Sequence, residues 1–199
     1  MDFFIHWTIR GRVLKGGQRG VVSLVRPARR HYHWNQLCKR LNSPIMKHIR
    51  KPERLLKTFV FDVWICNVDR HGDNLIAYPK GNKYSFYLID HGLALLGAMK
   101  WRRAPWYSPY WDEVAKYNRH YVQGLRSYIY SYQQLSPYVK QIQRIPKYKI
   151  KKIVKSIPSS ILSYRKKKTI IKLLLSRQEY LHFIVHRWFA WNRTNGQLR

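Results

Sequence analysis

Hydrophobic residues between positions 53 and 67 recur every three or four residues, which is the spacing of one buried helix face. The residues of this face are Leu56, Phe59, Val60 and Val63. The helix is predicted to begin at Glu53, where a negative charge suits the helix dipole, and to end near Asn67. Gly72 and the polar residues around it then predict a loop.

Two apolar segments after this loop predict a β-hairpin. Residues 75–78 and 84–89 have the short length and the apolar and aromatic content of strands. The four residues between them, Pro79-Lys80-Gly81-Asn82, are typical of a hairpin turn. We therefore expect Asp90 to lie directly after the second strand.

Three more helices are predicted, over residues 114–135, from Pro146 to Pro158, and from 167 to about 191. The expected buried positions are Ile150, Ile153, Val154 and Ile157 in the middle helix, and Ile170, Leu174, Leu181, Ile184 and Trp188 in the last. Residues 101–111 are rich in Trp, Tyr and Pro, and they predict an irregular loop.

Residues 1–50 carry weaker patterns. Two short strands are predicted at 3–9 and 21–25, on either side of a Gly-rich basic segment. The run 26–34 predicts a loop, and Ser43-Pro44 and Lys51-Pro52 mark turns or helix starts. The chain shows no internal repeat and no low-complexity tract.

Composition indicates a folded, strongly basic protein. An apolar fraction of 45% over 199 residues is enough for a core, and the net charge of +30 attracts polyanions. Two cysteines make neither a disulfide framework nor a Cys-rich zinc site, and Cys66 is expected in the core. We find no signal peptide and no window of the ~18 apolar residues that a membrane span needs. A cytoplasmic location is therefore expected.

Four of the nine acidic residues lie between positions 62 and 90: Asp62, Asp69, Asp73 and Asp90. Asn74 follows Asp69 by five positions, and Asp90 follows the hairpin. This is the arrangement of a kinase phosphoryl-transfer site. In such a site the first Asp accepts the proton of the substrate hydroxyl, and the Asn and the later Asp hold Mg²⁺ on the ATP phosphates.

Around these residues the sequence resembles the HipA-like kinases, a bacterial branch of the protein-kinase fold that is also similar to phosphatidylinositol kinases. The resemblance rests on FDVWICNVDRHGDNLIAY and YLIDHGLAL, and it continues in RIPKYKIKKIVKSIPSSIL and IIKLLLSRQEYL. It covers roughly residues 52–187. It implies an α+β, protein-kinase-like fold with a mostly helical C-terminal lobe at 51–199, ATP and Mg²⁺ as cofactors, and a protein Ser/Thr hydroxyl as acceptor.

The resemblance also implies a role for each residue of the loop. Asp69 would be the catalytic base, and Asn74 and Asp90 would bind the metal and the nucleotide phosphates. The remaining loop residues, Asn67, Arg70 and His71, would shape the loop or contact phosphate. From the residues themselves we expect Asp62 to brace the loop from the helix, Asp73 to be solvated and replaceable, and His91 to have a supporting role.

The chain departs from this family upstream. Residues 1–50 are too few for a complete N-terminal lobe, and no strand there reads Val-Ala-Ile-Lys. Lys15, followed by Gly16-Gly17, is a candidate phosphate clamp, and the competing interpretation is a flexible basic loop. The chain is accordingly interpreted as a reduced kinase, as a pseudokinase without catalysis, or as one lobe of a two-part protein.

Two other functions compete with the kinase hypothesis. The first is nucleic-acid binding through basic patches with nearby Trp and Tyr, at 26–30, 100–103, 147–155 and 165–168. The second is a metal-dependent nuclease built from Asp69, His71, Asp73, Asp90 and His91. In the purely structural alternative, Asp69 and Asn74 are turn residues that bond their own backbone.

Overall fold

The computed structural model describes residues 30–41, 43–97 and 122–194, apart from the side chains at 126, 188 and 191–194. Contacts between Cα atoms divide the chain into two units, Met1–Arg30 and His31–Arg199. The second unit is described below. The predicted strands at 3–9 and 21–25, Lys15, and the loop at 101–111 lie outside the described residues.

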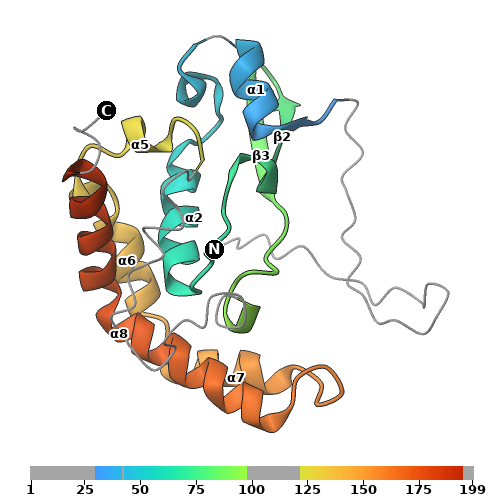
Figure 1. Cartoon of the computed structure of the whole chain (residues 1–199), viewed down its shortest axis with the longest axis vertical. Coiled ribbons are helices and arrows are strands. Elements are labelled where there is room, and N and C mark those ends of the chain that lie inside the picture. The colour runs from blue at the N-terminus through green and yellow to red at the C-terminus, as the bar shows by residue number, and fades with distance from the viewer. Residues whose placement is uncertain (1–29, 42, 98–121, 195–199) are drawn as a thin grey trace, which may run out of the picture. The chain divides into compact units, whose positions relative to one another are not determined.

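The second unit has an α+β fold that is mostly helical (Figure 1). Its described elements are β1 (Tyr32–His33), α1 (Trp34–Leu41), the 3-10 helix η1 (Ile45–His48), α2 (Glu53–Trp64), the 3-10 helix η2 (Gly72–Asn74), β2 (Leu75–Lys80), β3 (Lys83–Leu88), α5 (Leu125–Tyr128), the 3-10 helix η4 (Tyr132–Gln134), α6 (Ser136–Gln143), α7 (Lys147–Ser156) and α8 (Tyr164–Thr194).

The sheet is antiparallel with the order β1-β2-β3. The predicted hairpin is confirmed, with Leu75 opposite Leu88 and Ala77 opposite Phe86. Its turn is shorter than predicted, because Pro79 and Lys80 belong to β2 and only Gly81-Asn82 connects the strands. Proline is tolerated there because β1 pairs with β2 only at Ile76 and Ala77, so that β2 is an edge strand at Pro79.

Gly81 has a φ of 65°, a left-handed conformation that suits the first position of a two-residue hairpin turn. A Cβ at this position would meet no atom within 4 Å. Gly81→Ala is therefore expected to lower the free energy of unfolding through backbone strain alone, by about 1 kcal/mol. Urea denaturation would measure this, with Asn82→Ala as the control expected to change little.

The core forms where α2 and α8 pack together, with α6 and α7 also lying against α8 (Figure 1). All four residues of the predicted α2 face are buried. The stripe predicted on α8 is confirmed for Ile170, Leu174, Leu181 and Ile184. In α7, Ile150 and Val154 are buried, but the prediction for Ile153 is wrong, since its side chain is 67% exposed.

Two predictions of secondary structure are wrong. The expected loop at 26–34 ends in β1 and the first residue of α1, because Trp34 is fully buried and donates from Nε1 to the Gln123 carbonyl at 3.0 Å. The expected helix at 114–135 is not continuous in its described part. Gly124 has a φ of 84°, a left-handed conformation that interrupts the chain before the short helix α5 begins. Ser131 then caps η4, which is a separate helix.

Two neighbouring side chains of α8 bind the C-terminal ends of other helices. The fully buried Arg177 donates from Nη2 to the Val63 carbonyl at 2.6 Å and from Nε to the Trp64 carbonyl at 3.1 Å, at the end of α2. Gln178 donates from Nε2 to the carbonyl of Ile142 in the last turn of α6 and to the carbonyl of Ile145 just after it. A cation at the C-terminal end of a helix also suits the helix dipole.

Arg177→Met is expected to lower the free energy of unfolding by about 2–4 kcal/mol, because it removes the hydrogen bonds from a charged, buried side chain to the Val63 and Trp64 carbonyls. Lys172→Met removes a cation from an exposed position of the same helix and is the matched control. Equal losses in the two variants would mean that the capping contacts of Arg177 are not important for stability.

Candidate functional site

The loop that follows α2 is built from the end of this helix. Cys66 has a φ of 57°, a left-handed conformation that turns the chain out of the helix. The Asn67 N–H then donates to the Asp62 carbonyl at 2.8 Å. The loop therefore returns toward the last turns of α2, and the Asp62 side chain lies beside it.

The Asp62 carboxylate binds two side chains of the loop. Asn67 Nδ2 donates to Oδ1 at 2.8 Å, while Arg70 donates from Nε to Oδ2 at 2.9 Å and from Nη2 to Oδ1 at 3.2 Å. The side chains of Asp62 and Arg70 have no exposed area. A bidentate ion pair buried in this way fixes the loop in one conformation. The predicted bracing contact of Asp62 is thus present in the structure.

Arg70 also connects the loop to both ends of the hairpin. Its Nη1 donates to the Asn74 carbonyl at 3.2 Å and to the Ile89 carbonyl at 2.8 Å. The Ile89 N–H donates to the same Asn74 carbonyl at 3.0 Å. Further along, Val68 and Leu93 share a backbone hydrogen bond of 3.3 Å. The segment that contains Asp90 is therefore attached next to the loop that contains Asp69 and Asn74.

Asn74 is buried, and its side chain acts within the loop. Its Nδ2 donates to the Asp69 carbonyl at 2.8 Å, and we find no hydrogen bond to its Oδ1 among the described residues. The Asp69 N–H donates to Asn67 Oδ1 at 3.3 Å, and 37% of the Asp69 side chain is exposed. The backbone of Asp69 is thus held from both sides, while its carboxylate retains access to solvent.

Asp90 follows β3 in a left-handed conformation, with a φ of 47°. Asp90 is exposed, and its Oδ1 accepts the Gly92 N–H at 3.0 Å. A carboxylate and an amide oxygen are hard ligands of the kind that Mg²⁺ prefers. Asn74 Oδ1 and the Asp90 carboxylate are therefore chemically suited to hold this ion.

The two histidines of the site lie near its charged residues. His71 Nδ1 accepts the Asp73 N–H at 3.2 Å, and its Nε2 lies 3.2 Å from Asn74 Nδ2 and 3.9 Å from the Asp69 carboxylate. For His91, desolvation and then the Arg70 charge lower the pKa below the ordinary 6.5, against the opposing effects of Asp62 and Asp90. A neutral His91 is consequently favoured at neutral pH.

Strand β1 and helix α1 contact the loop through His33 and Asn35, which sequence analysis did not identify. Asn35 Nδ2 donates to the exposed Asp73 carboxylate at 3.4 Å, and His33 Nδ1 lies 3.1 Å from the Asp73 carbonyl. The Asn35 side chain also covers Gly72, where a Cβ would come too close to its Oδ1. A side chain at position 72 would therefore displace the side chain of Asn35 from the loop.

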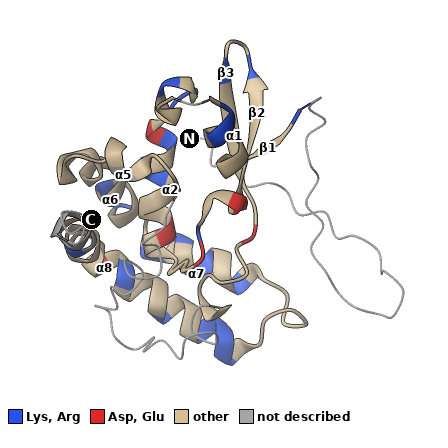
Figure 2. Ribbon diagram, turned by 45° about the horizontal axis from the view of Figure 1, so that its top comes forward, with Lys and Arg blue, Asp and Glu red and all other residues tan. Residues whose placement is uncertain are grey.

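Acidic residues are concentrated around α2 and the segments that flank the hairpin, whereas Lys and Arg are spread over the helices (Figure 2). Within the described part of the chain, no three residues of His, Cys, Asp and Glu are arranged to hold a metal ion. The nuclease hypothesis therefore gains no support from these residues. The magnesium hypothesis rests on one Asp, one Asn and phosphate oxygens, a set of a different kind.

Neither cysteine belongs to the site. Cys38 and Cys66 are buried, and burial raises the pKa of each thiol to about 11. At pH 8 a thiol reagent such as DTNB is expected to react at least about 100-fold more slowly with the folded protein than with the urea-unfolded chain, because little thiolate is present. A fast native reaction would show that one of the thiols is accessible.

Comparison with known proteins gives no relative: no family model, no curated protein and no solved structure matches the chain. Among the described helices, none has both the length and the apolar character that crossing a membrane requires. The class of the fold is α+β, and the function of the site has to be inferred from its own residues.

Proposed function

We propose that this protein is an ATP- and Mg²⁺-dependent phosphotransferase of the HipA-like kinase type, acting on a Ser/Thr hydroxyl of a protein. The observation that supports this proposal best is the pair of contacts from Arg70 to the Asn74 and Ile89 carbonyls. They hold the end of the hairpin beside the loop. Two metal-ligand candidates and one candidate base therefore come from segments that are attached to each other.

In this proposal Asp69 accepts the proton of the substrate hydroxyl. Its carboxylate is accessible, while its backbone is held by Asn67 and Asn74. Asn74 Oδ1 and Asp90 would hold Mg²⁺, which neutralises charge on the phosphates. The hydroxyl oxygen forms a bond to the γ-phosphorus as the bond to the β-phosphate oxygen breaks, so that ADP and a phosphorylated hydroxyl result.

Calorimetric titration with ATP in the presence of Mg²⁺ tests this proposal. The wild-type protein and Asp73→Ala are expected to bind ATP in a Mg²⁺-dependent manner, because Asp73 is exposed and outside the ligand set. Asp90→Ala is expected to lose this binding, because it removes a metal ligand. Equal ATP binding in all three proteins would refute the role of Asp90 as a metal ligand. No ATP binding in any of them would refute a functional nucleotide-binding site.

A further inference from the structure

Helix α7 and the first turns of helix α8 present a surface of one charge only. Residues 114–178 contain no Asp and no Glu. The exposed cations of α7 and of the first turns of α8 are Lys147, Lys149, Lys151, Lys152, Lys155, Arg165, Lys166, Lys168 and Lys172. We call these residues, together with the four apolar residues introduced next, the α7–α8 surface. Because this stretch contains no acidic residue of its own, its positive charge is available to an external anion.

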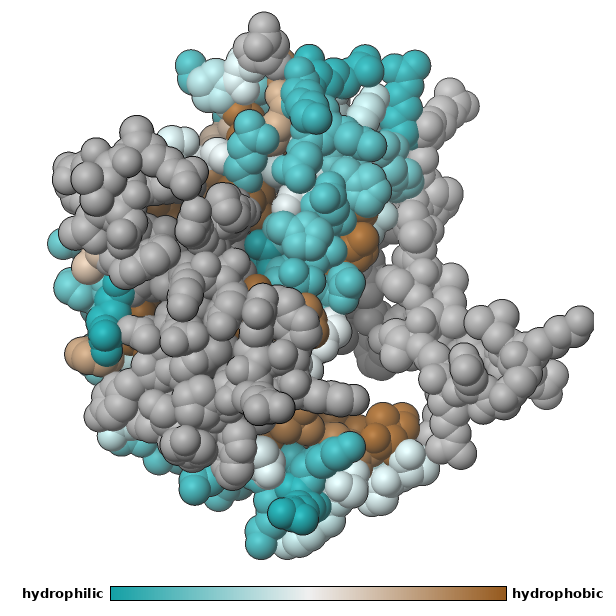
Figure 3. Space-filling model, viewed as in Figure 1, coloured by the Kyte–Doolittle hydropathy of each residue, from teal (hydrophilic) through white to brown (hydrophobic). Residues whose placement is uncertain are grey.

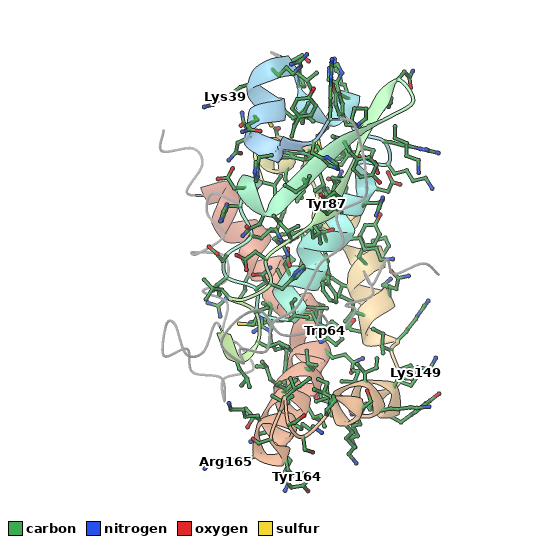
Figure 4. All side chains as sticks on the ribbon, turned by 90° about the vertical axis from the view of Figure 1, so that its right-hand side faces the viewer. Lys39, Trp64, Tyr87, Lys149, Tyr164 and Arg165 are labelled. Carbon is green, nitrogen blue, oxygen red and sulfur yellow. The ribbon has the colours of Figure 1, made fainter. Side chains whose placement is uncertain are left out.

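Large apolar side chains are exposed in the same segment. Tyr148 and Ile153 on α7 are 64% and 67% exposed, Ile161 before α8 is 62% exposed, and Tyr164 at the start of α8 is 70% exposed. Apolar atoms accordingly lie beside hydrophilic ones at the lower end of the molecular surface in Figure 3. Figure 4 shows Lys149, Tyr164 and Arg165 pointing away from the helices that carry them.

The two helices hold this surface in place. Ile150 and Val154 are the buried residues of α7, so the opposite face of this helix is left to solvent. The buried Lys167 donates from Nζ to the Lys155 carbonyl at 3.2 Å, which joins the first turn of α8 to the last turn of α7. The exposed residues of both helices are thus kept close together without contribution from the candidate active site.

We propose that the α7–α8 surface binds the surface of an anionic lipid bilayer. Exposed isoleucines favour this partner, because aliphatic side chains can enter the boundary between headgroups and acyl chains, whereas they cannot stack on bases as aromatic rings do. Eight of the nine exposed cations are lysines. Arginine is the residue that recognises nucleic acid best, while a cluster of lysines with apolar neighbours is typical of binding to anionic lipid.

Co-sedimentation of the full chain with vesicles tests this proposal. Vesicles of phosphatidylcholine alone are compared with vesicles that contain phosphatidylserine in addition. The wild-type protein is expected to sediment only with the second kind, and a rise in salt is expected to weaken binding. Lys149→Glu/Lys152→Glu/Lys155→Glu is expected to weaken binding at least about 100-fold, because each cation near such a surface contributes roughly fivefold.

Matched variants separate this surface from the general charge of the protein. Lys80→Glu/Lys83→Glu reverses the charge of two exposed lysines at the hairpin, and this variant is expected to bind the anionic vesicles much more tightly than the triple variant. Ile153→Ser/Ile161→Ser keeps every charge, and it is expected to weaken vesicle binding about tenfold or more by removing apolar insertion. Circular dichroism checks that each variant is folded.

Three outcomes would overturn the proposal. The first is no sedimentation with anionic vesicles. The second is that the hairpin variant loses as much vesicle binding per reversed lysine as the triple variant. This would mean that the net charge of the protein, and not the α7–α8 surface, attracts it to the vesicles. The third is that a fluorescent single-stranded oligonucleotide binds more tightly than vesicles and is insensitive to Ile153→Ser/Ile161→Ser, which would assign the surface to nucleic acid. None of these outcomes depends on Asp69 or Asp90, so they leave the proposed phosphotransfer untouched.

Discussion

Asp62→Ala is expected to lower the free energy of unfolding by about 3–5 kcal/mol, because it leaves the Arg70 guanidinium buried without its carboxylate. Both side chains are fully buried, and Asp62 also accepts the hydrogen bond from Asn67. Removal of one partner of such a pair lowers the free energy of unfolding by much more than the intact pair contributes to it, since the remaining charge is buried and desolvated. Urea denaturation followed by circular dichroism would measure the loss.

Asp73→Ala is the matched control for this prediction, because Asp73 is an acidic residue of the loop that Asp62 binds, and its side chain is 60% exposed. We expect it to change the free energy of unfolding by less than about 0.5 kcal/mol. A double-mutant cycle with Arg70→Met then tests the pair itself. Strong non-additivity is expected, with the double variant hardly less stable than Asp62→Ala. Additive losses would mean that the two side chains act independently.

The parts of the fold that could be predicted are those with local periodicity. Helix α2 has four apolar residues at helical spacing, and the hairpin has two short apolar strands around Gly81, so each follows from neighbouring residues. In contrast, β1 has two residues and α1 has eight. Segments this short do not show enough periodicity to be distinguished from a loop. They form because Trp34 packs edge-on against Phe86, far away in the sequence.

The location of the candidate site could be predicted as well as the local elements of the fold, whereas its long-range contacts could not. The spacing of Asp69 and Asn74 identified the loop, and the position of Asp62 in the preceding helix indicated its bracing contact. The role of Arg177 gave no signal, since one arginine does not stand out among 39 lysines and arginines, and its partners are backbone carbonyls more than a hundred positions away. The contacts of His33 and Asn35 with the loop are likewise long-range. Such contacts depend on the tertiary fold.

Asp69→Asn is expected to reduce phosphotransfer by about 10²–10⁴-fold while ATP binding and stability stay the same. The amide is nearly the same size as the carboxylate, and the two hydrogen bonds that the Asp69 backbone makes with Asn67 and Asn74 do not involve the side chain that changes. Only the capacity to accept a proton is lost. Transfer of labelled γ-phosphate from ATP to a protein hydroxyl, with the chain's own serines and threonines as the first acceptors, would measure the rate.

This result separates catalysis from binding, because Asp90→Ala is expected to abolish both. If Asp69→Asn transferred phosphate at the wild-type rate, Asp69 would not be the base, and the exposed carboxylate would have only the structural role of a turn residue. If wild type bound ATP with Mg²⁺ but transferred nothing, either to itself or to added protein, the chain would be a pseudokinase. In that case Arg70 would hold the loop and the hairpin together for nucleotide binding alone.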